Sequence, residues 1–477
     1  MKILFTAAEC APFFKTGGLG DVVFALPQAL AKKGHEVIEV LPFYTTMPVK
    51  YQEKLTDMFN FYVCVGWRNQ YCGVKVLKMG GVKYYFLDNK YYFDRPNLYG
   101  YYDDGERFAF FQQAVIELMQ RISYIPDILH CNDYHTAFIP FLLKEKYGWI
   151  KAFDHIATVL TIHNLEFQGQ YGREVLPELF GMSTKRYDDG TIKMGDAVNF
   201  MKAGIFYADK VNTVSPSYAA EIQTPAYGCH LDEILRMCNF KLSGILNGID
   251  YTINDPQTDP ALAKHYSSKN LQGKRKDKAA LQKKFGLKVD PKVPLIGIVS
   301  RLTYQKGFQL VVSEMENLLQ FNVQVVVLGT GYHNFEHDFR YFAGKYPDKC
   351  GVMIDFDVNL AQQIYAGCDM FLMPSAFEPC GLSQMIAMRY GTLPIVHQVG
   401  GLNDSVWIYN PLEEIGTGFG FEEFNSFWMM EAIKRAMDVY THKPDVWHKM
   451  VKIAMTSDFS WNIASGHYLD LYQSILR

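Results

Sequence analysis

Residues 3–22 of the chain read ILFTAAECAPFFKTGGLGDV, an apolar run that is followed by a glycine-rich loop. The pattern predicts a strand over Lys2–Ala8, a loop over Lys15–Asp21 and a helix that begins near Val22. Adjacent glycines ahead of a helix leave backbone N–H groups and the positive end of the helix open to an anion, and Lys15 adds a full charge. The segment therefore predicts a strand, a diphosphate-binding turn and a helix.

The glycine spacing of this loop does not fit two common kinds of phosphate-binding loop. Glycines stand at positions 17, 18 and 20, a spacing that matches neither the dinucleotide-binding fingerprint nor the P-loop. A nicotinamide-dependent oxidoreductase would share doubly wound sheets, but it requires G-x-G-x-x-G and an acidic residue about 20 positions later. Taken alone, a loop of this kind is more often a tight turn with a surface lysine. The prediction of a diphosphate site therefore depends on residues elsewhere in the chain.

The composition bounds the domain count and the partners. A chain of 477 residues exceeds what one hydrophobic core usually organises, which predicts two large domains. Its 49% of hydrophobic and 20% of charged residues are those of an ordinary soluble globular protein. The formal net charge of -3 provides no bulk attraction to nucleic acid or to an anionic membrane, so we expect neither as a partner.

The cysteines and the N-terminal segment indicate the compartment. The chain has 9 cysteines, none of them in a C-x-x-C pair, so neither a disulfide framework nor a zinc cluster is indicated and reduced thiols are expected. Met1 leads straight into the first predicted strand without a signal or transit pattern, and no span of about 18 apolar residues follows. We expect a cytoplasmic protein, and the oligomeric state stays open.

Short β-branched runs alternate with helical patterns along the chain, which is typical of parallel sheets covered by helices. The strands expected in the first half are Lys2–Ala8, Glu36–Leu41, Val74–Lys78, Lys83–Leu87, Asp127–His130, Ala157–Ile162 and Lys210–Thr213. Those expected in the second half are Pro294–Ser300, Val323–Leu328, Val352–Ile354, Met370–Met373 and Leu393–Val396.

The pattern breaks between the two halves, at the hinge candidate GILNGID (residues 244–250) and in the polar stretch that continues to about residue 293. We predict an α/β protein of two doubly wound, Rossmann-like domains that face each other across a cleft. The first domain is expected over residues 1–245 and the second over 246–457. A last helix over 458–477 is expected to return to the first domain.

Polar residues follow the predicted strands, where open α/β sheets bind their ligands. Arg301 and Lys306 flank a tight loop, and two cations there suit a diphosphate leaving group; two solvated basic residues are an equally open interpretation. Glu378 stands just before a predicted helix start that Pro379, Gly381 and Ser383 would shape and cap. Its carboxylate could hydrogen-bond sugar hydroxyls, or serve only in capping.

Histidine pairs could suggest a metal site, but the spacing argues against one. His130 and His135 lie close in sequence, and His333 and His337 have i,i+4 spacing. No third and fourth ligand accompanies either pair at a suitable distance along the chain. We therefore expect neither a metal nor another cofactor.

Eight segments together carry a resemblance to a known family. They are KTGGLGDV (15–22), FDRPNLYG (93–100), HCNDYHTA (130–137), TIHNLEFQG (161–169), LNGID (246–250), SRLTYQKG (300–307), PSAFEPCGLSQ (374–384) and VGGLNDSV (399–406). In this order, each near a strand end, they resemble the bacterial glycogen synthase and plant starch synthase family over essentially the whole chain. That family consists of ADP-glucose-dependent retaining glucosyltransferases of the GT-B fold.

The resemblance implies a role for particular residues. Lys15 and Gly18 would meet the donor's phosphates from the first domain, which is the acceptor side, while Arg301 and Lys306 would clamp the diphosphate from the second, nucleotide-binding domain. The resemblance also implies that the backbone N–H groups of Leu382 and Ser383 contact phosphate. It assigns hydroxyls of the transferred glucose to Glu378, Cys380 and Gly381, and places His163 and Asn247 near the 6-hydroxyl, with Asp133 and Asp21 nearby. The ring of Phe356 would stack on adenine. Ile386 stands where many retaining relatives carry a second glutamate, and Gln384 is the nearer polar group.

The implied reaction is transfer of glucose from ADP-glucose to the non-reducing end of an α-1,4-glucan, with retention. A phosphate oxygen of the departing ADP would serve as the base, and the two cations would replace magnesium. Arg301, Lys306, Glu378, His163 and Asp133 are the expected catalytic group. A related transferase that uses UDP-glucose and a non-catalytic glucan-binding protein remain the alternatives.

Overall fold

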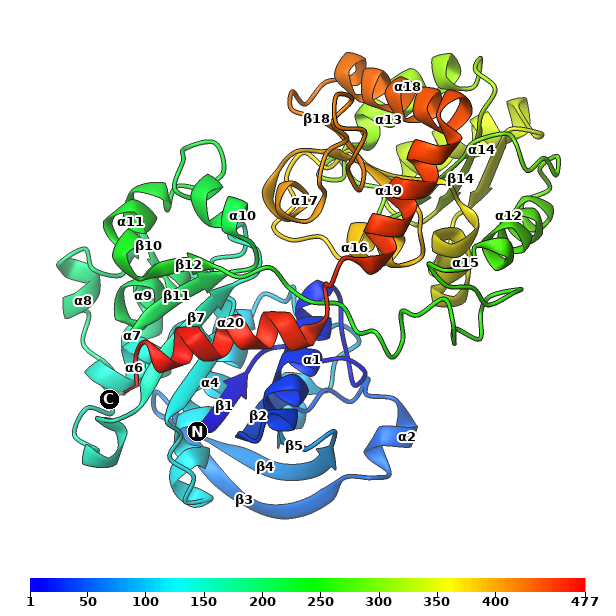
Figure 1. Ribbon diagram of the computed structural model, residues 1–477. Helices are drawn as coiled ribbons and strands as arrows, with labels where there is room; N and C mark the ends of the chain where they lie inside the picture. Colours follow the sequence, from blue (N-terminus) through cyan, green and yellow to red (C-terminus); the bar gives the residue numbers. More distant parts are fainter. Residues whose placement is uncertain (477) are drawn as a thin grey trace. The chain divides into compact units, whose positions relative to one another are not determined.

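The computed structural model describes residues 1–476 and divides into two compact units (Figure 1). The N-terminal unit comprises Met1–Ile245 and the segment that starts at Trp461, and the C-terminal unit comprises Leu246–Ser460. Each unit has its own central sheet covered by helices. The mixed α/β class that the sequence predicts is confirmed.

The N-terminal unit is built on a sheet of nine strands. In spatial order these are β12 (Leu242–Gly244), β11 (Lys210–Thr213), β7 (Ala157–Ile162), β6 (Ile128–Asn132), β1 (Lys2–Thr6), β2 (Glu36–Pro42), β5 (Val82–Asp88), β4 (Arg68–Met79) and β3 (Thr56–Val65). The strands from β12 to β5 are parallel, and β4 and β3 extend the sheet as an antiparallel hairpin. A small second sheet holds β8 (Gln170–Tyr171), β10 (Ala197–Asn199) and β9 (Lys193–Met194).

The helices of this unit include one from the far end of the chain. They are α1 (Gly18–Lys32), α2 (Val49–Gln52), α3 (Lys90–Phe93), α4 (Asp104–Arg121), α5 (Tyr134–Ala137), α6 (Ile139–Glu145), α7 (Val175–Phe180), α8 (Lys185–Asp188), α9 (Phe200–Tyr207), α10 (Pro216–Glu221), α11 (Asp232–Met237) and α20 (Trp461–Gln473). Helix α20, red in Figure 1, packs beside α1. Its Tyr472 hydroxyl lies 2.7 Å from Nδ1 of the buried His130, and its Tyr468 hydroxyl accepts a hydrogen bond from Asn212 Nδ2 at 3.1 Å.

The C-terminal unit has a six-stranded, entirely parallel sheet. Its spatial order is β15 (Cys350–Met353), β14 (Gln324–Leu328), β13 (Leu295–Val299), β16 (Met370–Met373), β17 (Leu393–His397) and β18 (Phe419–Phe421). The covering helices are α12 (Gln272–Lys284), α13 (Phe308–Leu318), α14 (His333–Lys345), α15 (Val358–Gly367), α16 (Ser383–Arg389), α17 (Gly400–Ser405), α18 (Ser426–His442) and α19 (Pro444–Thr456). The strand order reverses between β13 and β16, which is the point where doubly wound sheets bind ligands.

Local expectations differed from the structure in several places, of which two are instructive. Helix α1 begins at Gly18 rather than near Val22, because Leu19 already faces the core with Val22 and Val23. The loop therefore ends at Gly17, and the next two glycines form the first helical turn. Strand β3 was also not among the expected strands, and its alternate residues Asn60, Tyr62 and Cys64 are exposed. A half-exposed strand of this kind lacks the continuous apolar run of a buried parallel strand.

Candidate active site

The loop after β1 is held by a buried carboxylate that sequence reasoning did not find. Glu9 Oε2 accepts hydrogen bonds from the backbone N–H and the hydroxyl of Thr16, at 2.6 and 2.8 Å. Burial raises the pKa of Glu9, while these hydrogen bonds act in the opposite direction. The signal available in the sequence was a glutamate in an otherwise apolar segment. Lys15, next in the loop, forms an ion pair with Asp21 of α1, with Nζ 2.8 Å from Oδ1.

Asp133 and His163 meet at the carboxyl ends of β6 and β7. Asp133 Oδ1 accepts the backbone N–H of His163 at 2.7 Å and that of Asn164 at 3.4 Å. Burial raises the pKa of Asp133 to about 7, opposed by these two bonds. Asp133 has φ of 56°, a conformation that costs energy for a residue other than glycine and that clusters at functional sites. The carboxyl group thus holds the backbone that carries His163.

The His163 ring is a neutral donor in this arrangement. Burial lowers the pKa of His163 to about 3. Its Nε2 lies 2.9 Å from Asn132 Oδ1, and because an amide oxygen only accepts, Nε2 carries the proton. Asn132 is a second residue that sequence reasoning missed, although it belongs to the HCNDYHTA segment.

The C-terminal unit brings Lys306 and Glu378 into contact at the switch between β13 and β16. Lys306 Nζ lies 2.5 Å from Glu378 Oε2, and the Ser375 hydroxyl donates to the same oxygen at 3.0 Å. Gly307 permits the approach, because a Cβ there would lie 1.9 Å from the carbonyl oxygen of Pro374 and its φ is +79°. Among residues 1–476, the guanidinium of Arg301 makes no ion pair or hydrogen bond, so it remains free for a ligand.

The start of α16 differs in one respect from the expectation. The residue before the first turn is Leu382, which offers no side-chain cap, and Ser383 instead accepts a hydrogen bond from the Tyr365 hydroxyl at 3.1 Å. The prediction that Ser383 caps the helix was therefore wrong. Gly381 adopts φ of +71°, which turns the chain into the helix.

Asn247 lies against Cys380, so two of the predicted glucose ligands are neighbours. Burial raises the pKa of the Cys380 thiol to about 12, and hydrogen bonds from the backbone and side chain of Asn247 partly oppose this. The thiol is therefore protonated at neutral pH. Asn247 is buried, yet its Oδ1 has no hydrogen-bond partner in the described part of the chain. An orphaned buried acceptor fits a ligand hydroxyl.

Phe356 follows β15 and is 79% exposed. The two aspartates beside it, which matched no pattern in the sequence, shape the turn: Asp355 Oδ1 accepts the Phe356 N–H at 2.7 Å, and Asp357 caps α15 by accepting the Leu360 N–H at 2.9 Å. A large exposed ring on a fixed turn is suited to stacking.

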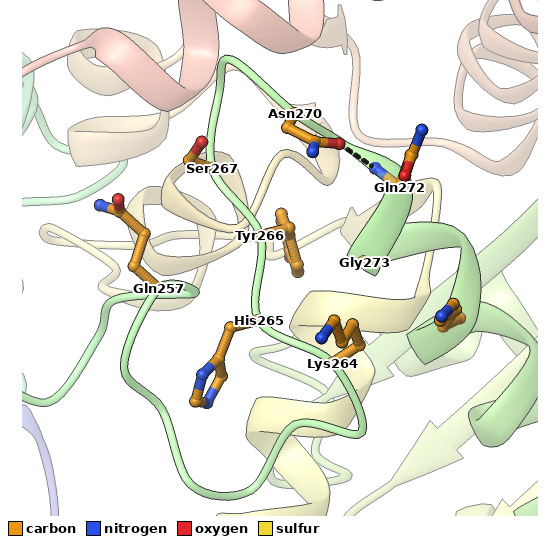
Figure 2. A pocket seen from close by; sticks show the side chains of 9 residues that line it. Gln257, Lys264, His265, Tyr266, Ser267, Asn270, Gln272 and Gly273 are labelled. Carbon is orange, nitrogen blue, oxygen red and sulfur yellow. Dashed lines mark hydrogen bonds between the residues drawn. The ribbon is translucent and has the colours of Figure 1, made fainter.

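A separate cavity of about 350 Å³ lies in the same unit and contains none of the predicted residues. Figure 2 shows Lys264, His265 and Tyr266 along one extended segment, with Gln272 and Gly273 at the start of α12. In residues 1–476 no three His, Cys, Asp or Glu side chains group as a metal site would require. No helix within that range is both long and apolar enough to span a membrane.

Comparisons with known proteins agree with this picture. Residues 2–237 match the family model "Starch synthase catalytic domain", and residues 280–449 match "Glycosyl transferases group 1". Glycogen synthases of Ligilactobacillus salivarius and Lactobacillus acidophilus are 66% and 59% identical to this chain, with all of each chain covered. The catalytic domain of starch synthase IV from Arabidopsis thaliana, bound to ADP and acarbose, has a TM-score of 0.91 at 34% identity, covering 99% of this chain and 98% of that one.

A more distant structure shares the fold. Sucrose-phosphate synthase from Thermosynechococcus elongatus has a TM-score of 0.63 at 17% identity, covering 99% of this chain and 98% of that one. The protein is thus a glycosyltransferase of the GT-B fold, as predicted. More particularly, the chain belongs to the glycogen and starch synthase family and is a retaining glucosyltransferase with the glycogen synthase function. The alternatives of a UDP-glucose enzyme and of a non-catalytic glucan-binding protein are not favoured.

Proposed function

We propose that this enzyme transfers glucose from ADP-glucose to the 4-hydroxyl at the non-reducing end of an α-1,4-glucan, in the cytoplasm. The observation that carries the proposal is the arrangement of Arg301, Lys306 and Glu378 around the switch point of a nucleotide-binding type of sheet. An unpaired guanidinium on the loop that carries Lys306 and a Lys306–Glu378 pair offer positive charge to a diphosphate and a carboxylate to a sugar. The Arabidopsis starch synthase, which was solved with ADP and acarbose bound, supports both ligand classes.

The chemistry of each group follows from its charge. The anomeric C–O bond of the donor breaks through an oxocarbenium-like state, and negative charge moves onto the diphosphate. Arg301 and Lys306 stabilise that charge more strongly in the transition state than in the ground state, which lowers the barrier. An oxygen of the departing phosphate accepts the proton of the attacking 4-hydroxyl on the same face, so no protein acid and base pair is required.

The glucose-binding group combines one carboxylate with neutral polar groups. Glu378 accepts hydrogen bonds from glucose hydroxyls, with Cys380 and Gly381 beside it, and the orphaned Asn247 Oδ1 accepts from the 6-hydroxyl. His163 contributes near the same hydroxyl, with its backbone fixed by Asp133. Phe356 stacks on adenine through its exposed ring.

The phosphate-binding group includes backbone as well as side chains. Lys15 and Gly18, at the start of α1, and the N–H groups of Leu382 and Ser383 are assigned to the donor phosphates. In the structure Lys15 pairs with Asp21. Binding of the donor therefore requires Lys15 to exchange its ion pair with Asp21 for a contact with phosphate. This exchange costs little free energy, because exposed ion pairs contribute little to stability.

The test is a product assay. Purified enzyme is mixed with ADP-glucose or UDP-glucose, with and without glycogen, in excess chelator, and nucleotide release and chain elongation are followed. We expect ADP release that depends on glucan, with ADP-glucose strongly preferred and turnover maintained in chelator. Equal use of UDP-glucose would contradict the donor assignment, and loss of turnover that magnesium restores would contradict the role given to Arg301 and Lys306.

A further inference from the structure

Two hydrogen-bond donors hold the Glu378 carboxylate in one orientation. Lys306 Nζ and the hydroxyl of the buried Ser375 both donate to Oε2, at 2.5 and 3.0 Å. Within residues 1–476 no hydrogen bond goes to Oε1. Two donors on one oxygen fix the plane of the carboxylate and leave the other oxygen for a ligand.

Ser375 is in turn held by a histidine that the proposed function does not use. His397 ends β17, and its Nδ1 lies 2.7 Å from the Ser375 carbonyl oxygen. Its Nε2 lies 3.0 Å from the carbonyl oxygen of Glu422, just beyond β18. A carbonyl oxygen only accepts hydrogen bonds, so in each of these two contacts the ring nitrogen must be the donor.

The His397 ring has little freedom to leave this position. It is 3% exposed and stacks on Phe421 with ring centres 5.3 Å apart and an interplanar angle of 26°. The loop that carries Ser375 is fastened on its other side as well, because the Ala376 N–H donates to the Gln305 carbonyl at 2.8 Å. The segment between β16 and α16 is therefore tied both to the Lys306 loop and to the β17 end.

We propose that Ser375 and His397 are positioning residues for the transfer reaction. His397 holds the Ser375 backbone, and the Ser375 hydroxyl turns Glu378 so that Oε2 stays with Lys306 and Oε1 meets a hydroxyl of the transferred glucose. The inference rests on the assignment of Glu378 to glucose in the proposed function. Loss of either residue lowers kcat, because Glu378 is then no longer held toward the glucose. ADP affinity stays unchanged, because neither residue is assigned to the nucleotide.

A matched pair of variants separates this role from a merely structural one. The amide nitrogen of His397→Asn takes about the place of Nδ1 and can still donate to Ser375, whereas that of His397→Gln takes about the place of Nε2 and reaches Glu422. We expect His397→Gln and Ser375→Ala to lower kcat about tenfold, with KM for ADP-glucose and the Kd of ADP within about twofold of the unaltered enzyme. His397→Asn should retain kcat within about threefold.

The outcomes are distinguishable. The melting temperature of each variant is measured first, and Ser375→Ala, which removes one hydroxyl, keeps the test valid where a histidine variant fails to fold. Equal losses in His397→Asn and His397→Gln, or unchanged kcat in Ser375→Ala, would overturn the positioning role while the proposed function stands. Glu378→Gln is measured in parallel: full kcat in that variant would overturn the assignment of Glu378 itself, and the positioning role with it.

Discussion

The carboxylate of Asp133 and the backbone N–H of His163 form a 2.7 Å hydrogen bond that joins the ends of two neighbouring parallel strands. Asp133 has a positive φ of 56° at this position. The contact links a titratable group to the segment that we assign to glucose binding.

Replacement of Asp133 by asparagine should change how stability depends on pH. The folded-state pKa of about 7 lies above the ordinary aspartate pKa of 3.8, so protonation favours folding. This contribution to the free energy of unfolding amounts to up to about 4 kcal/mol. It is complete below about pH 4 and is lost as the pH rises through 7. The variant lacks it. Urea unfolding at pH 5 and pH 8 should show a smaller fall in the free energy of unfolding for Asp133→Asn, and equal falls would contradict the raised pKa.

Glu378→Gln should lower kcat by about 10²–10³, because the charge-assisted contacts to glucose weaken. ADP affinity should stay within about threefold, since Glu378 is assigned to the sugar. Steady-state kinetics and calorimetric titration of ADP measure the two quantities. A drop in ADP affinity as large as the drop in kcat would place Glu378 at the nucleotide instead.

Lys15→Ala should lower kcat/KM for ADP-glucose by about tenfold or more, because one charge-assisted contact to phosphate is removed. Lys33→Ala provides the matched control, since this exposed lysine lies at the other end of α1. Kinetics with varied ADP-glucose at saturating glycogen compare the two. Equal values for both variants would mean that the loop after β1 is only a turn.

Lys274→Met should remove a pH-dependent contribution to stability at alkaline pH. Lys274 is half-buried, and its Nζ donates to the carbonyls of Ala366 and Tyr390 and to the Thr392 hydroxyl. Burial lowers its pKa from 10.5 to about 8, so the folded protein releases a proton that the unfolded chain retains between these values. Stability gained from this group therefore rises from pH 8 to about 10.5, by up to about 3 kcal/mol.

The measurement is the difference in unfolding free energy between the unaltered protein and Lys274→Met at pH 8 and pH 10. The unaltered protein should gain relative to the variant as the pH rises. A constant difference would show that Lys274 titrates normally in the folded state.

Much of the fold could be predicted from local pattern. Strands such as Ala157–Ile162 and Met370–Met373 have the bounds that the sequence predicts, because strands buried on both faces are continuous apolar runs with polar ends. The edge strand β3 and the first turn of α1 could not be found in this way. Their residues are half exposed or are glycines, and contacts with distant parts of the chain decide their conformation.

The sequence by itself determined the class of the protein, two Rossmann-like halves and the identity of the candidate residues, since these depend on periodicity and on motifs of a few residues each. Only the tertiary structure decided the pairings: Lys306 with Glu378, Asp133 with the backbone of His163, and His397 with Ser375. The partners of each pair are separated by 72, 30 and 22 positions. Such contacts arise because parallel strands bring their carboxyl ends to one edge of a sheet, which local sequence does not encode.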